Sequence, residues 1–162
     1  MIQRIQTVFL FVAAISMVCM LFFPIWNKVN ETMTEMAIMD AYKLEYSQIG
    51  ENGEMVVMAT KDTYFVAILA VVSALVALFS VFQYSNRLRQ IQLGALNSLL
   101  ILVLMVSTIW VVLKSEATLA PSLQGTYLIG FYFPLVSLLC NLMANRFIRR
   151  DEQLVRSADR IR

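Results

Sequence analysis

Four long stretches of the chain contain no charged residue, and shorter polar segments separate them. Each stretch exceeds the roughly 20 residues that an α-helix needs to cross about 30 Å of hydrocarbon. Because a backbone in lipid must satisfy its own hydrogen bonds, this pattern predicts membrane-spanning helices. The charge-free stretches cover residues 5–27, 63–86, 90–113 and 117–145. We place the four predicted spans near residues 6–26, 64–84, 92–113 and 126–146.

The first stretch also resembles a secretory signal peptide, because MIQRIQ is a short positive segment that precedes an apolar run. However, the run is about 20 residues long, where a signal peptide has roughly 7–15, and no small-residue cleavage site ends it. It closes on Pro24 and Trp26, and tryptophan is common where a span meets the membrane surface. We therefore interpret it as an uncleaved first span.

The polar segment between the first two spans shows the alternation of a β-hairpin. Tyr42, Leu44 and Tyr46 alternate with polar residues, which is typical of a strand. The following Gly-Glu-Asn-Gly contains an Asn-Gly pair that favours a tight hairpin turn, and MVVMAT then predicts the return strand. Residues 28–36 fit either a third strand or a helix, and the pattern leaves both open.

These features predict an all-α membrane protein: a four-transmembrane-helix bundle with a small β-hairpin-containing extracytoplasmic loop between spans 1 and 2. We expect residues 1–162 to form a single integral membrane domain. Within it, residues 27–63 form an outer lobe and residues 147–162 form a basic, amphipathic cytoplasmic tail.

Charge is distributed unevenly between the two ends of the predicted bundle. Only 15% of the 162 residues are charged and 59% are hydrophobic, against roughly 25% charged in soluble domains. One set of connecting segments holds all nine arginines and three acids, and the other holds all four lysines and eight acids. Because Lys and Arg accumulate on the cytoplasmic side, both termini and the turn at 85–91 are predicted to be cytoplasmic.

The spans hold no residue with obvious chemistry. None contains Asp, Glu, Lys, Arg or His, whereas ion-coupled transporters usually keep an ionisable group at membrane depth. The chain has no histidine at all, which removes the commonest general base and a common metal ligand. We therefore predict that the protein is not an enzyme and has no catalytic residue, metal site, cofactor or nucleic-acid partner.

Three polar residues stand out inside the last two spans. Asn97 and Asn141 lie about six residues from the cytoplasmic ends of their helices, hence at similar depth, and Ser98 is adjacent. They can hydrogen-bond across the helix interface, either as structural contacts between helices or as the lining of a polar substrate pocket.

The C-terminal tail combines arginines with apolar residues at helical spacing. Phe147, Leu154 and Ile161 are seven residues apart, as are Ile148 and Val155, which predicts one apolar stripe. Such a helix fits either a protein partner or an anionic membrane surface. The candidate binding residues are Arg149, Arg150, Leu154, Val155, Arg156, Arg160 and Ile161.

The two ends of the chain carry a resemblance to a known family. MIQRIQTVFL at the start and NRFIRRDEQLVRSADRIR at the end resemble a Bacteroidota family of small four-span inner-membrane proteins of unknown function. In that family an IQRIQT-type opening and an RRDE-x-LVRSADR-type tail enclose the spans, over essentially this whole length. The resemblance implies a multi-pass protein of the bacterial inner (cytoplasmic) membrane and implies no activity.

Two functions from different classes follow. In the first, the protein is a non-catalytic accessory or scaffold protein that binds a membrane-protein partner, or a second copy of itself, within a membrane complex. In the alternative, it is a small transporter or lipid-handling protein whose polar pocket is lined by Asn97, Ser98 and Asn141.

Overall fold

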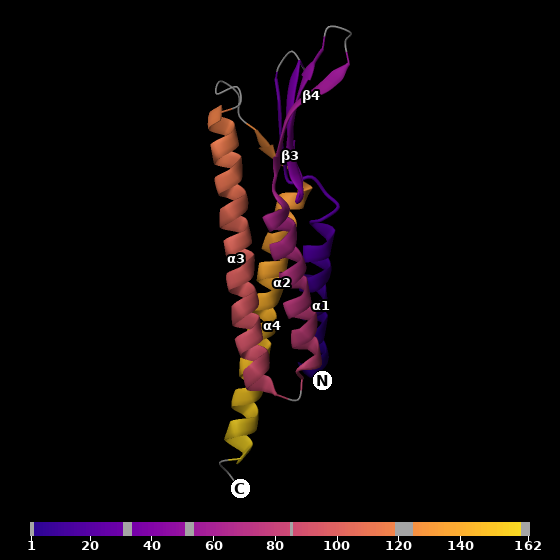
Figure 1. Ribbon diagram of the computed structural model, residues 1–162. Coiled ribbons are helices and arrows are strands. Elements are labelled where there is room, and N and C mark those ends of the chain that lie inside the picture. Colours follow the sequence, from indigo (N-terminus) through magenta and orange to yellow (C-terminus); the bar gives the residue numbers. More distant parts are fainter. Residues whose placement is uncertain (1, 31–33, 51–53, 85, 119–124, 160–162) are drawn as a thin grey trace.

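The computed structural model describes residues 2–30, 34–50, 54–84, 86–118 and 125–159. Within these residues, four helices run along the long axis of the molecule and a β-sheet stands at one end of the bundle (Figure 1). Both chain ends and the α2–α3 connection lie at the opposite end. The helices are α1 (Ile2–Cys19), α2 (Tyr64–Phe82), α3 (Arg87–Thr118) and α4 (Ile129–Asp159).

The helices form a ring in which each one packs against two neighbours. α1 contacts α2 and α4, and α3 contacts the same two helices. Small residues make this approach possible on α2, where Ala67, Ala70, Ala74 and Ala77 are buried at helical spacing. Large apolar side chains on the outside of the ring are exposed, as expected for a surface that faces lipid.

The sheet is antiparallel and has the strand order β4-β3-β2-β1-β5. Its strands are β1 (Trp26–Val29), β2 (Glu35–Met39), β3 (Lys43–Ile49), β4 (Met55–Asp62) and β5 (Thr126–Tyr127). The first four strands follow one another in sequence, whereas β5 comes from the segment before α4 and pairs with β1. The sheet therefore ties both extramembrane segments together.

The first apolar stretch leaves the helix earlier than predicted. α1 ends at Cys19, and the Phe22 N–H donates to the Cys19 carbonyl at 3.0 Å to close its last turn. Pro24 has no N–H and disfavours helical geometry in the residue before it. The Ile25 N–H then donates to Met39 O at 2.8 Å, so the chain has already joined the sheet.

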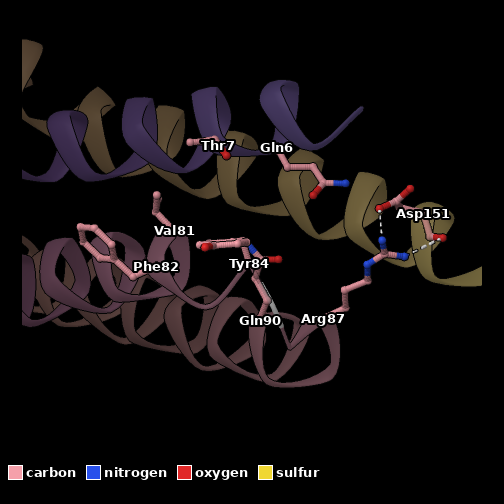
Figure 2. A pocket seen from close by; sticks show the side chains of 8 residues that line it. All are labelled: Gln6, Thr7, Val81, Phe82, Tyr84, Arg87, Gln90 and Asp151. Atoms are coloured by element: carbon pink, nitrogen blue, oxygen red, sulfur yellow. Dashed lines mark hydrogen bonds and ion pairs between the residues drawn. The ribbon is translucent and has the colours of Figure 1, made fainter. Parts of the chain in front are cut away.

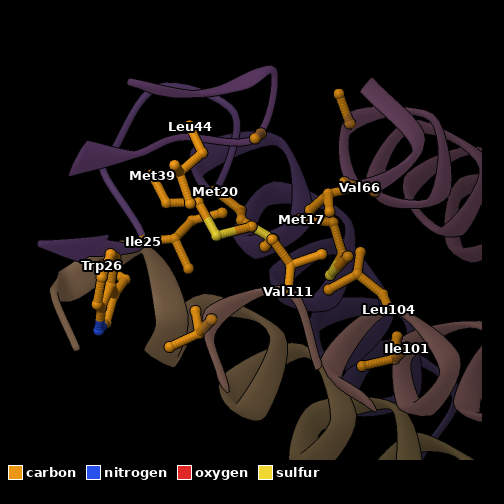
Figure 3. Close-up of a cluster of buried hydrophobic side chains, with 14 of the residues drawn as sticks. Met17, Met20, Ile25, Trp26, Met39, Leu44, Val66, Ile101, Leu104 and Val111 are labelled. Carbon is orange, nitrogen blue, oxygen red and sulfur yellow. The ribbon is translucent and has the colours of Figure 1, made fainter. Parts of the chain in front are cut away.

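The sheet and the bundle share one hydrophobic core (Figure 3). Trp26 of β1 is fully buried in it, and its indole lies so close to Gly125 that a Cβ there would come within 2.2 Å. Glycine at position 125 therefore allows the backbone to pass directly over the indole ring of Trp26. The core joins α1 to the sheet and to α3 through Met17, Met20, Ile25, Met39, Leu44, Val66, Ile101, Leu104 and Val111.

The predicted all-α, four-span fold class is wrong. The described residues contain a five-stranded antiparallel sheet, and three helices are long and apolar enough to cross a membrane. The apolar part of α1, Ile5–Cys19, is shorter, and 15 residues at about 1.5 Å each fall short of about 30 Å of hydrocarbon. Of the apolar residues after Cys19, Met20, Ile25 and Trp26 enter the core beneath the sheet instead of extending a helix. The three long helices indicate a membrane protein. They are Tyr64–Phe82, Arg87–Glu116 and Ile129–Val155.

The strands of the predicted hairpin are confirmed. β3 pairs with β4 from Lys43↔Asp62 to Ile49↔Met55. Of the predicted turn at residues 50–53, residues 51–53 lie outside the described residues. The register shifts at Tyr46/Ser47, which produces a bulge in β4. The described residues of segment 28–36, for which strand and helix were both open, belong largely to β1 and β2.

Candidate functional site

The polar residues predicted inside the bundle lie at helix interfaces. The Asn141 Nδ2 donates to Gly94 O at 2.7 Å and to Ser98 Oγ at 2.8 Å, so α4 is hydrogen-bonded to α3. Gly94 is required here, because a Cβ on it would lie 2.0 Å from Asn145 Oδ1. The predicted contact between Asn141 and Ser98 is therefore present.

Asn97 hydrogen-bonds to α2, and not to Ser98 or Asn141 as the sequence suggested. Its Oδ1 accepts a hydrogen bond of 2.7 Å from Ser73 Oγ on α2. Asn97 and Asn141 are both fully buried, and each keeps one amide atom without a partner, Nδ2 in Asn97 and Oδ1 in Asn141. The geometry suits contacts that hold α2, α3 and α4 together, each worth about 1 kcal/mol or less in a membrane helix bundle.

The tail continues α4 beyond the bundle (Figure 1). The predicted stripe is divided, because Ile148 is buried in the bundle while Leu154 and Val155 are exposed. Arg149 and Arg150 are also exposed. The side chain of Arg156, together with residues Arg160 and Ile161, lies outside the described residues.

A cavity of about 420 Å³ opens at the end of the bundle that holds the termini (Figure 2). Arg87 closes one side of it, with an ion pair to the Asp151 carboxylate at 3.2 Å and a hydrogen bond to the Asp151 carbonyl at 3.2 Å. Gln6 lines the cavity and is buried, and its Nε2 has no partner. The remaining lining residues are Thr7, Val81, Phe82, Tyr84 and Gln90. The cavity therefore combines the apolar side chains of Val81 and Phe82 with several polar groups, among which the Gln6 amide donor has no partner.

The opposite end of the molecule presents an open sheet edge. All eight residues of β4 are exposed, and β4 is the terminal strand of the sheet. Four consecutive apolar residues, Met55, Val56, Val57 and Met58, have exposed fractions between 48% and 62%. An edge strand leaves a row of backbone N–H and C=O groups unpaired, and natural sheets usually protect it with charge or cover. Residues 55–60 carry no charge.

The hydrogen-bond pattern between β3 and β4 shows which residues of β4 direct their backbone N–H and C=O groups toward the open edge. The Gly50 N–H donates to Glu54 O at 2.9 Å, which makes Gly50 and Glu54 a hydrogen-bonded pair. Because such pairs alternate along an antiparallel ladder, Val56 directs its backbone groups toward β3. Met55 and Val57 therefore direct theirs toward the open edge.

Charged residues gather where the sheet meets the start of α2. Lys43 forms an ion pair with Glu45, and this carboxylate raises the pKa of the lysine. Burial raises the pKa of the neighbouring Asp40 carboxyl, the negative charge of Glu45 raises it further, and Lys43 opposes both effects. No group of three or more His, Cys, Asp or Glu side chains suited to a metal ion occurs within the described residues.

Sequence reasoning missed several residues that shape these surfaces. Ser73 and Asn145 were not selected, although each is a buried polar residue in an apolar helix, which is the signal by which Asn97 and Asn141 were found. The sequence predicts β4 as the return strand of a hairpin, but the hairpin pattern does not indicate that its second edge is open. Its signal was present in six uncharged residues of strongly β-forming character.

Comparison with known proteins identifies a family for the chain. A family model described as Domain of unknown function (DUF4293) matches residues 2–161, so the chain belongs to that family. A search of curated proteins finds no match.

Proposed function

We propose that this DUF4293 member is a non-catalytic accessory protein that holds a partner protein at the membrane through the open edge of β4. The observation that carries the proposal is an eight-residue terminal strand, exposed along its whole length, whose first four residues are apolar. A partner in extended conformation would pair with the edge as a further antiparallel or parallel strand.

The exposed groups of the β4 edge indicate which residues a partner strand should carry. The outward backbone groups of Met55 and Val57 supply hydrogen bonds, and the exposed side chains of residues 55–58 supply apolar contact. The segments at this end of the molecule contain four lysines and eight acids, a net charge of −4. We therefore propose an extended segment with apolar residues at alternate positions and basic residues flanking them.

The protein is further proposed to lie in a bacterial inner membrane, with the end that holds the termini in the cytoplasm and the sheet outside. All nine arginines lie near the chain termini or in the first turn of α3, which supports this orientation. Single cysteines at Met58 and Ser157, in a background without Cys19 and Cys140, test it. A membrane-impermeant thiol reagent added to intact cells should label position 58 alone, and labelling of 157 alone would reverse the orientation.

The transporter alternative is not supported by a specific observation. Asn97 and Asn141, which it would use as pocket lining, are fully buried at helix interfaces and hydrogen-bonded to Ser73, Gly94 and Ser98. The tail remains a proposed secondary contact through Leu154 and Val155, with either a partner or the membrane.

The test uses a photo-crosslinking residue at Met58 in the full-length chain in its native membrane. The proposal expects one discrete crosslinked protein. A crosslinker at Val106, which is exposed on α3, should instead give lipid adducts.

The matched variants are Val57→Pro and Val57→Thr. Proline removes an outward N–H and leaves the hydrogen bonds to β3 intact, whereas threonine keeps the N–H and the β-branched shape. The crosslink at Met58 should be lost in the first and kept in the second. A crosslinked product with twice the mass of the chain would assign the edge to self-pairing, and lipid adducts alone would contradict the proposal.

A further inference from the structure

A groove of about 740 Å³ runs between α3 and α4 at the end that holds the termini. Three arginines of α4, Arg146, Arg149 and Arg150, line one side of it, and no acidic residue is among its lining within the described part of the chain. Their spacing of three and four residues places them on one helix face. Neither the Arg87–Asp151 nor the Lys43–Glu45 ion pair involves them. The groove is therefore a concentrated positive site.

The floor of the groove holds a buried polar group that has no partner. Asn145 lines it, is only 7% exposed, and leaves Oδ1 without a hydrogen bond. Within the lining, Ser98 of α3 is a second polar group, and its hydroxyl already donates to Gly94 O at 3.1 Å. The Asn145 Oδ1 packs against Gly94 of α3 and is closed to the groove, so the arginines supply the strongest polar contacts for a ligand there.

An apolar track continues from the groove along the same side of α3. A second hollow of about 540 Å³ is lined by Leu102, Val106 and Trp110 among others. These residues follow Ser98 at steps of four, so they lie on one face of the helix. From Ser98 to Val106 the helix rises about 12 Å, and to Trp110 about 18 Å. One leaflet of hydrocarbon is about 15 Å thick, half of the full core.

We propose that this groove binds a single anionic phospholipid. The phosphate would accept charge-assisted hydrogen bonds from Arg146, Arg149 and Arg150. An acyl chain would lie along α3 past Leu102 and Val106. The site is at the opposite end of the molecule from β4, so evidence against lipid binding here would not affect the proposed function of β4, and the reverse also holds.

The test is native mass spectrometry of the full-length protein after incubation with equal amounts of phosphatidylglycerol and phosphatidylcholine in mild detergent. We expect one phosphatidylglycerol to be retained in preference to phosphatidylcholine. The double variant Arg149→Gln, Arg150→Gln should lower that retention about tenfold or more, because two charge-assisted contacts are removed. The matched control is Arg89→Gln, which removes an exposed arginine from the same end and should leave retention within about twofold.

A second variant separates the groove from general charge. Ala95 is exposed and lines the groove, so Ala95→Trp should block the groove and lower retention without altering any charge. Equal retention of the two lipids, or an equal loss in Arg89→Gln, would overturn the site. Displacement of the lipid by millimolar inorganic phosphate would assign the arginines to a soluble anion and overturn the lipid. Circular dichroism confirms that each variant is folded before it is compared.

Discussion

β2 and β4 belong to the same sheet and are both rich in apolar residues, yet their environments are opposite. β2 lies between β1 and β3, and its Ala37 and Met39 are buried in the core. β4 has a neighbour on one side only, and every one of its residues is exposed. The comparison shows that apolar composition does not determine burial. Where a strand sits in the sheet decides whether its apolar residues stabilise the fold or remain available to another chain.

The largest expected difference comes from placing a charge in each strand. Ala37→Asp buries an unpaired carboxylate in the core and should destabilise the protein by about 3 kcal/mol or more. Val57→Asp places the same group in solvent and should change stability by about 0.5 kcal/mol or less. Thermal unfolding in detergent, followed by the loss of sheet signal in circular dichroism, measures both. Equal losses in the two variants would mean that β4 is not an open edge.

A smaller difference is expected between adjacent positions of β4 itself. Val56→Pro removes an N–H directed at β3 and should cost about 1–3 kcal/mol through the lost ladder bond and its unpaired acceptor. Val57→Pro removes an outward N–H and should cost less than half as much. Denaturant unfolding of the purified proteins compares them. If Val57→Pro were the more damaging change, the assignment of outward groups would be reversed.

The smallest effect concerns the pH dependence of the junction between the sheet and α2. Burial raises the pKa of Asp40 in the folded protein, so the folded state holds that proton more tightly than the unfolded chain. Stability from this group is therefore present below the unfolded pKa and is lost as pH rises through the folded pKa. Asp40→Asn should remove that loss and slightly raise the unfolding temperature at neutral pH. An unchanged pH profile would show that the carboxyl does not contribute.

The β3–β4 hairpin was predictable because alternation of period two is a local signal, as is the Asn-Gly pair. The helix from Tyr64 to Phe82 was also predictable, because it is bounded by charge on both sides. The contact between Asn141 and Ser98 followed from their similar depth. In each case a signal within a few residues sufficed.

The other features depended on tertiary contacts. Residues 20–26 are as apolar as the helix before them, so composition could not show that the helix ends at Cys19 and that Trp26 enters a strand. β5 has only two residues and exists because it pairs with β1 across a long sequence separation. The grouping of Arg146, Arg149 and Arg150 in a groove beside Asn145 required the packing of α3 on α4.

The most direct test of the account is hydrogen exchange at the open edge. Peptides covering residues 55–60 would be compared between native membrane vesicles and the purified protein in detergent. We predict slow exchange at the Met55 and Val57 amides in native membranes, where a partner strand covers them, and fast exchange after purification. Equally fast exchange in both samples would contradict the proposal that β4 is occupied by another chain.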